Sequence, residues 1–235
     1  MIVSACVIFP EGEDLRDWRN SLPEDNIEVV ALQITVNSRL KQPIFTEVGR
    51  IEGHTVLSWE VPNIEDYFDF SYCRNKLDEY ATGEWILHMD SDERLCSPHD
   101  DFWNYIEELN DSDADAAMLT IAGTNPDIDE RIKYARNRYA GSSMRIKRRA
   151  SGIKWKSICH EVLDIENRDS VIGDTDIVLF HYGYSKTKEE IYKKTERNAK
   201  LMIREYTREK SDRNWQYLIN TFSYLKTKQN EVTSW

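Results

Sequence analysis

A group of carboxylates stands directly after an apolar stretch of strand length. The stretch Glu84 to Met89 is followed without a break by Asp90, Ser91, Asp92 and Glu93. Open α/β sheets bind ligands at the carboxyl ends of their strands, so we expect these carboxylates at such an edge. Two Asp residues separated by one residue can both approach a hard cation, which prefers oxygen ligands. The pattern therefore predicts either a divalent-metal site that holds a diphosphate, or an ordinary acidic turn that caps the next helix.

The composition is that of a folded protein. Of 235 residues, 40% are hydrophobic and 31% are charged, which does not indicate disorder. The net charge of -11 argues against general binding to nucleic acid, because that binding needs Lys and Arg to meet phosphates. An anionic small ligand stays compatible with this charge, since a metal ion can reverse the local sign.

The sequence also gives expectations about the compartment. The N-terminus lacks the basic start and long apolar core of a signal peptide, and no apolar run approaches the ~20 residues of a membrane span. The four cysteines are scattered without a C-x-x-C pair, so neither a zinc site nor a disulfide framework is indicated. We therefore expect a cytoplasmic protein with reduced thiols.

Alternating strand-like and helical stretches predict an α/β fold. Apolar runs typical of strands cover residues 2–9, 27–36, 54–59, 84–89 and 116–122, and helical spacing covers 14–22, 70–80 and the stretch after Pro98. A short helix is expected around 45–50. Gly83 is expected just past a helix end with left-handed backbone, and Ser97 is expected to cap the next helix.

Beyond residue 122 the pattern changes. Short runs of mixed polarity at 131–139, 143–148, 160–165 and 177–182 predict a smaller, partly antiparallel second layer. A capping box at Thr187 to Glu190 opens a long helix, and Ser211 is expected to cap another. We therefore expect one domain over residues 1–184 and a C-terminal helical hairpin, residues 185–235, packed on it.

The stretch from Asp69 to Arg94 resembles the DxD region of family 2 glycosyltransferases with the GT-A fold. In the subgroup that it resembles, an Arg-Asn pair on a helix precedes a "GEW-apolar-DxDE" segment. Here these are Arg74-Asn75, then Gly83-Glu84-Trp85 through Asp90 to Glu93. The resemblance covers residues 1 to about 200 and implies a GT-A-like fold, with a mixed, mainly parallel sheet flanked by helices.

The resemblance implies a metal-dependent inverting glycosyltransferase. Such an enzyme moves a sugar from a nucleotide diphosphate donor, above all a UDP-sugar, to a hydroxyl of a glycan, lipid or protein. The implied cofactor is Mn²⁺ or Mg²⁺, with Asp90, Asp92 and His181 as its ligands; oxygen ligands do not separate the two ions. Contacts with the nucleotide-sugar donor are implied for Phe9, Pro10, Glu11, Glu60, Arg74, Asp90 and Ser91.

An inverting transfer also needs a base that takes the proton of the acceptor hydroxyl. His160-Glu161 follows Gly152 and Trp155 in a segment that resembles the family's "G…W…HE", so Glu161 is the expected base, with His160 beside it. Plainer alternatives remain open. Glu161 could face solvent or pair with an Arg, and His181 could be a buried histidine at a strand end.

Plainer alternatives also remain open for the arginine and lysine residues. Arg74 could be a helix-surface residue that pairs with Asp78 four residues on. Arg145, Lys147, Arg148 and Arg149 form a basic run. That run could be a solvated strand edge that deters edge pairing, or it could bind an anionic substrate.

One departure from the family leaves the nucleotide base open. Relatives carry an Asp soon after the second strand, where this chain has Asn37-Ser38. Two other functions therefore stay open. One is a sugar nucleotidyltransferase, although the acidic stretch Pro10 to Asp14 would repel a triphosphate. The other is a degenerate module that binds a glycan or a protein. Peripheral contact with a membrane and the oligomeric state also stay open.

Overall fold

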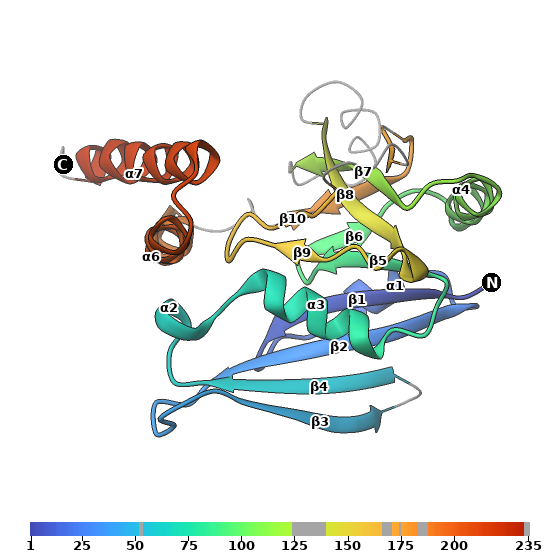
Figure 1. The fold of residues 1–235 in the computed structure, drawn as a ribbon, viewed down its shortest axis with the longest axis horizontal. Coiled ribbons are helices and arrows are strands. Elements are labelled where there is room, and N and C mark those ends of the chain that lie inside the picture. Colours follow the sequence, from blue (N-terminus) through green and yellow to red (C-terminus); the bar gives the residue numbers. More distant parts are fainter. Residues whose placement is uncertain (52–53, 124–139, 166–170, 174, 183–187, 233–235) are drawn as a thin grey trace.

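The computed structural model describes residues 1–51, 54–123, 140–165, 171–173, 175–182 and 188–232 (Figure 1). A ten-stranded sheet forms its centre, in the order β3-β4-β2-β1-β5-β8-β7-β12-β6, with β11 paired to β7. The strands are β1 Val3–Pro10, β2 Ile27–Val36, β3 Ile44–Ile51, β4 His54–Val61, β5 Trp85–Asp90, β6 Glu93–Leu95, β7 Ala116–Gly123, β8 Ala140–Arg148, β11 Val171–Ile172 and β12 Val178–His181.

Helices cover both faces of this sheet. They are α1 Arg16–Asn20, α2 Ile64–Tyr67, α3 Phe70–Tyr80, α4 His99–Asp111, α6 Lys188–Arg208 and α7 Asp212–Val232. A 3₁₀ turn, η1, spans Arg149–Ser151, and a separate hairpin pairs β9 Trp155–Lys156 with β10 Val162–Leu163. The predicted fold class, a mixed α/β sheet flanked by helices and followed by a helical pair, is confirmed.

The parallel half of the sheet positions the predicted site. Strands β4, β2, β1 and β5 are neighbours and run parallel. In this register Ile8 lies opposite Asp90, and Pro10 lies opposite Ile34. The carboxyl ends of these strands therefore meet at one edge, and the acidic residues after β5 lie at that edge as expected.

Alternation along the strands gives the sheet two cores. Val7 and Leu87 pack with Phe102 on the face covered by α1 and α4. Leu57 packs with Leu77 of α3 and Leu201 of α6 on the opposite face. Successive side chains of a strand point to opposite faces, so both faces of β1, β2 and β5 must be apolar. This is why these strands read as continuous apolar runs in the sequence.

The expected short helix at 45–50 is wrong. Residues 44–51 form β3, which pairs antiparallel with β4 at the edge of the sheet. Ile44, Thr46 and Val48 are β-branched and favour a strand. A register shift between Glu47 and Gly49, where Gly49 has φ +118°, bends this edge strand and breaks the simple alternation that would have revealed it.

The expected left-handed Gly83 is also wrong. Helix α3 ends at an extended Ala81, and Gly83 does not have positive φ. The residue is instead a point of close approach, because a Cβ built there would lie 2.6 Å from the Ser4 backbone N and 2.7 Å from the Ile2 carbonyl oxygen. The chain has room for only a hydrogen at this position.

Replacing Gly83 with Ala should therefore destabilise the fold. The new methyl group meets backbone atoms, which cannot move aside as a flexible side chain can, so we expect a loss of about 2 to 3 kcal/mol in the free energy of unfolding. Gly141→Ala is the matched control, since a Cβ there meets nothing within 4 Å. Urea denaturation of both variants measures the difference, and equal midpoints would contradict the steric account.

The expected cap at Ser97 is wrong because its hydroxyl is used elsewhere. Ser97 Oγ accepts a hydrogen bond from Val178 N at 2.8 Å and donates to the Asp176 carbonyl at 3.3 Å. Helix α4 starts after Pro98 without a side-chain cap. The serine thus joins the start of α4 to β12, a contact between residues about eighty positions apart.

The predicted second layer is wrong as well. Strands β8, β7, β12 and β6 continue the main sheet, with β8 antiparallel between β5 and β7. Within the described part of the chain, the β9–β10 hairpin alone forms a separate sheet. The expected strand at 131–139 and the cap at Thr187 lie outside the described residues.

The C-terminal helices pack together at one side of the molecule (Figure 1). Ser211 caps α7 as expected, since its Oγ accepts from Asn214 N at 3.2 Å. Leu201 of α6 and Leu218 of α7 join the core beneath α3, whereas Trp215 and Phe222 stay 48% and 46% exposed. No helix among the described residues is long and apolar enough to cross a membrane. The division of the chain at residue 184 stays a prediction.

Candidate functional site

Arg74 connects two carboxylates at the carboxyl edge of the sheet. Its side chain, on α3, is 2% exposed. Nε donates to Glu161 Oε1 and Nη2 donates to Asp90 Oδ1, both at 2.7 Å. Burial alone would lower the pKa of Arg74, but the two carboxylates outweigh it and raise that pKa. The alternative pairing of Arg74 with Asp78 is wrong. Arg74 is a buried cation that hydrogen-bonds both Glu161, the predicted base, and Asp90, the first of the acidic residues.

A second arginine holds the other side of Asp90. Arg145 of β8 donates through Nη2 to Asp90 Oδ2 at 3.2 Å and to Glu93 Oε1 at 2.6 Å. Asp90 N donates to Glu93 Oε2 at 2.8 Å. Burial by itself would raise the pKa of Asp90, but Arg145 and Arg74 together lower it well below its usual range. The Asp90 carboxylate is thus ionised, and each of its oxygens pairs with an arginine. We call Arg74, Asp90, Glu93, Arg145 and Glu161 the Arg74 cluster.

Asp92 and His181 form a separate pair beside this cluster. His181 Nε2, at the end of β12, lies 3.1 Å from Asp92 Oδ1, and Tyr182 N donates to the Asp92 carbonyl at 2.7 Å. Burial would lower the pKa of His181, but the hydrogen bond with Asp92 raises it. The antiparallel pairing of β12 with β6 therefore brings together two residues that are 89 positions apart in the sequence.

This pair fits a divalent cation in part. A carboxylate and an imidazole suit Mn²⁺, and Mg²⁺ is commonly held by one or two carboxylates plus substrate phosphates. Across the described ranges, no group of three or more His, Cys, Asp or Glu side chains is arranged to hold a metal by itself. A cation at Asp92 and His181 would therefore need ligands from the diphosphate of the substrate.

Helix α3 also fixes the segment that leads to Glu161. Asn75 Nδ2 donates to the Trp155 carbonyl, and Trp155 N donates to Asn75 Oδ1, both at 2.9 Å. One turn on, Asp78 accepts from His88 at 2.7 Å and from Lys147 at 2.5 Å. The Trp155 ring lies 4.9 Å from the Arg74 guanidinium carbon and 5.0 Å from the His88 ring. Two polar side chains of α3, Asn75 and Asp78, thus hold β5, β8 and β9 around Arg74.

His88 gives this arrangement a pH dependence. Burial lowers the pKa of His88 to about 4 from an ordinary 6.5, and Asp78 offsets only part of this. Below pH 6.5 the His88 imidazole is protonated in the unfolded chain but stays neutral in the folded chain. The free energy of unfolding should therefore fall as the pH falls from about 6.5 to about 4, by about 3 kcal/mol in total.

Urea denaturation of wild type and His88→Gln across this pH range tests the assignment. The variant lacks the titrating imidazole, so its free energy of unfolding should fall less steeply with falling pH. The difference in slope should correspond to about one proton fewer taken up on unfolding. Other groups titrate equally in both proteins and cancel in the comparison. Parallel pH profiles would show that His88 does not stay neutral in the fold.

The structure separates the two residues of the predicted catalytic pair. Glu161 is 12% exposed and pairs with Arg74, so the plainer alternative of a pairing with an Arg is confirmed. His160 has φ +56° and its ring stacks on Tyr217 of α7, with centroids 4.6 Å apart. Arg213 holds the His160 carbonyl at 2.6 Å. His160 therefore contacts the C-terminal helices, and the role of either residue in catalysis stays a prediction.

The other expected donor contacts lie along the same edge. Phe9 and Pro10 end β1, and Glu11 N donates to the Ile34 carbonyl at 2.9 Å. Asn37 Nδ2 donates to Glu60 Oε2 at 3.0 Å, which joins the ends of β2 and β4. The Ser91 carbonyl accepts from Arg94 at 2.8 Å. Their contact with a nucleotide stays a prediction.

The basic run is not a solvated strand edge, because Arg145, Lys147 and Arg148 belong to β8, inside the sheet, and Arg149 begins η1. Lys147 pairs with Asp78, and Arg149 Nε donates to the Gly83 carbonyl at 2.9 Å. Arg148 donates to the carbonyl of Leu109 near the end of α4, and its guanidinium carbon lies 4.4 Å from the centre of the Trp85 ring. Arg145 is the member of the run that reaches the site, and nothing in the sequence pattern distinguishes it from its neighbours.

No protein-family model matches the chain. Over 98% of its length, the chain is 21% identical to the SPbeta prophage-derived glycosyltransferase SunS of Bacillus subtilis strain 168, and equally to glycosyltransferase SunS of Bacillus phage SPbeta. The alignment covers 51% of each, so the chain spans about half the length of the curated relatives it matches.

Solved structures of S. aureus TarS, residues 1–349, also match. The complex with UDP aligns with 86% of this chain and 66% of that chain, at 13% identity and a TM-score of 0.47. The complex with UDP-GlcNAc aligns with 86% and 67%, at 14% identity and a TM-score of 0.45.

Proposed function

We propose that the chain is a metal-dependent inverting glycosyltransferase with a GT-A-like fold, which transfers a sugar from a UDP-sugar to a hydroxyl acceptor. One observation carries the proposal: a buried arginine at the carboxyl edge of the sheet holds both Asp90, the last residue of β5, and Glu161. Sequence similarity to a glycosyltransferase along nearly the whole chain supports it.

In this proposal the residues of the site divide the chemistry. Asp92 and His181 would hold a divalent cation, whose charge stabilises the diphosphate that leaves. Asp90, whose two oxygens pair with Arg74 and Arg145, would contact the donor, and its expected part as a further metal ligand stays a prediction. Arg74 fixes the positions of Asp90 and Glu161 through its two hydrogen bonds.

Glu161 Oε1 accepts from Arg74 Nε at 2.7 Å, and in this proposal the other carboxylate oxygen, Oε2, takes the proton. As the acceptor oxygen forms its bond to C1 of the sugar, the bond from C1 to the diphosphate oxygen breaks. The proton of the acceptor hydroxyl passes to Glu161, and the bonding electrons pass to the diphosphate. Attack opposite the leaving group inverts the configuration at C1.

Slow donor hydrolysis tests this function without knowledge of the acceptor. Wild type with Mn²⁺ should release UDP from at least one of UDP-glucose, UDP-galactose and UDP-N-acetylglucosamine. Chelation with EDTA or the substitution Asp92→Asn should abolish release, whereas Asp111→Asn on the exposed end of α4 should not. Pyrophosphate release from UTP and a sugar 1-phosphate would instead indicate a nucleotidyltransferase, and no release from any donor would contradict the proposal.

A further inference from the structure

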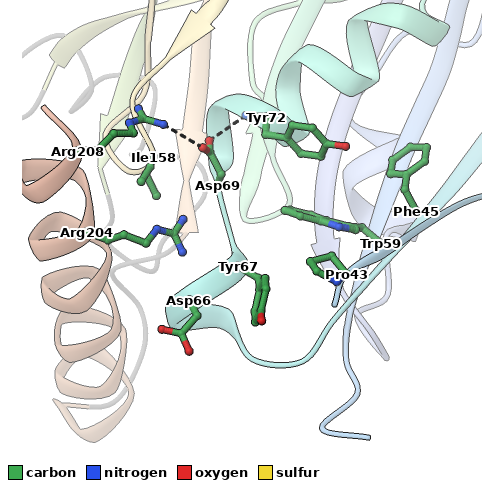
Figure 2. Close-up of a pocket in the computed structure, with 10 residues that line it drawn as sticks. All are labelled: Pro43, Phe45, Trp59, Asp66, Tyr67, Asp69, Tyr72, Ile158, Arg204 and Arg208. Carbon is green, nitrogen blue, oxygen red and sulfur yellow. Dashed lines mark hydrogen bonds and ion pairs between the residues drawn. The ribbon is translucent and has the colours of Figure 1, made fainter. Parts of the chain in front are cut away.

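A cavity of about 510 Å³ opens on the face of the sheet that α3 covers (Figure 2). Its walls come from the starts of β3 and α3, from β4 and α2, and from α6. Asp69, which caps α3 by accepting from Tyr72 N at 2.9 Å, lines the cavity, and so does Ile158. No residue of the Arg74 cluster lines the cavity, although Asp69 and Ile158 lie five and three residues before Arg74 and Glu161 in the sequence. We call it the side pocket.

One wall of the side pocket is aromatic. It consists of Phe45, Trp59, Tyr67 and Tyr72, which Figure 2 shows together on one side of the cavity. The Trp59 and Tyr72 rings pack with centroids 5.1 Å apart and planes tilted by 46°. Trp59 is 5% exposed and fixed in the core, whereas Tyr72 is 40% exposed. The wall therefore presents an accessible ring backed by a rigid one.

The opposite wall is ionic and carries both signs. Arg204 and Arg208, one turn apart on α6, lie together with Asp66 and Asp69 on the side of the cavity away from Phe45, Trp59 and Tyr72 (Figure 2). Arg208 Nη1 lies 3.5 Å from Asp69 Oδ2. Arg204 donates to the carbonyls of Glu65, at 2.8 Å, and of Phe68. Two carboxylates and two guanidinium groups give this wall hydrogen-bond acceptors and donors without a net charge.

We propose that the side pocket binds a neutral sugar residue. A sugar ring has apolar C–H faces that pack on aromatic rings, and hydroxyls that both donate and accept hydrogen bonds. The balanced charge of the wall gives no preference for an anion or a cation. The volume lies within the roughly 300 to 1,000 Å³ of small-molecule sites, and the mixture of aromatic walls and a few polar groups is typical of them.

This site is separate from the predicted donor site. Neither Asp92 nor His181 lines the side pocket. Trp59 lines it, but the next residue, Glu60, does not, and the Glu60 side chain accepts a hydrogen bond from Asn37. Sugar binding here and nucleotide binding at the Arg74 cluster can therefore succeed or fail independently. Should the proposed function hold, the bound sugar would belong to the acceptor, close to the segment that carries Glu161.

Saturation-transfer NMR and calorimetry with neutral trisaccharides test the proposal. The probes are maltotriose, mannotriose, globotriose and N,N′,N″-triacetylchitotriose, each titrated to millimolar concentration on the whole chain. At least one should bind, and Tyr72→Ala should weaken its affinity about tenfold, because the accessible ring is lost. Tyr72→Phe should keep the affinity within about threefold, and Phe222→Ala, an exposed aromatic outside the pocket, should leave it unchanged.

Asp66→Asn provides a second test at an exposed residue, where folding is not at risk. It removes one charge without changing shape, and should weaken the same trisaccharide severalfold. The proposal is overturned if no trisaccharide binds, if Tyr72→Ala and Asp66→Asn both bind like wild type, or if UDP displaces the sugar. Displacement by UDP would make the cavity part of a nucleotide site. Tighter binding of sialyllactose than of every neutral trisaccharide would also overturn it.

Discussion

Replacing Glu161 with Gln should lower the rate of UDP release from the donor by about 10²- to 10⁴-fold, the range that a general base contributes. The amide keeps the shape of the side chain, and its oxygen can still accept from Arg74 Nε, which lies 2.7 Å from Glu161 Oε1 in the wild type. What the amide loses is the ability to take a proton from the attacking hydroxyl or water. Catalysis should therefore fall much more than folding does.

Two further measurements separate this role from a structural one. The temperature shift that UDP causes should be the same in Glu161→Gln as in wild type, because the donor site keeps its cation and its arginines. Glu47→Gln on the exposed edge strand β3 is the matched control and should keep full activity. If Glu161→Gln keeps UDP release within threefold of wild type while Asp92→Asn loses it, the base lies elsewhere.

Replacing Arg74 with Ala should cost about 3 kcal/mol in the free energy of unfolding and abolish UDP release. Removing one partner of a buried ion pair leaves an uncompensated charge, which typically costs about 3 to 5 kcal/mol. Here Glu161 is 12% exposed but Asp90 is 39% exposed. Water therefore reaches Asp90, which also keeps its contact with Arg145, and we expect the lower end of that range.

The chain contains a suitable control for this loss. Arg16 and Asp14 form an ion pair at 2.5 Å, with side chains 85% and 55% exposed. Solvent screens such an exposed pair, so Arg16→Ala should unfold at nearly the wild-type urea concentration. If the two variants lose equal stability, Arg74 is not the buried centre of the site. Arg74→Lys should keep part of the stability but little activity, because an ammonium group cannot repeat the forked contact.

The sequence predicted the parallel half of the sheet more successfully than the other half. Strands buried on both faces must be apolar at every position, and β1, β2 and β5 show this directly. Edge strand β3 has one face in solvent and a bulge at Gly49, so its pattern was not recognisable. The position of β8 between β5 and β7 depends on pairings between distant segments, which periodicity does not record.

The candidate site was predicted to a similar extent. The acidic residues after β5, and Glu161, were found from their types and from a resemblance in motif. Their common partner was not fixed by the sequence, because Arg74 lies 87 residues from Glu161. A pairing with Asp78, four residues away, was the local alternative. Asp78 instead satisfies His88 and Lys147, and only the packing of α3 against β5 and β8 determines that choice.

Thermal unfolding with nucleotides tests the central claim, a nucleotide diphosphate site at Asp92, most directly. Wild type and Asp92→Asn are heated with UDP, GDP or CDP, each with and without Mn²⁺. A ligand at ~100 times its dissociation constant stabilises a fold by about 2.7 kcal/mol, which is a measurable shift in Tm. We expect UDP to raise the Tm of wild type only when Mn²⁺ is present, and to leave Asp92→Asn unchanged. If no nucleotide shifts the transition at any Mn²⁺ concentration, the proposed function is contradicted.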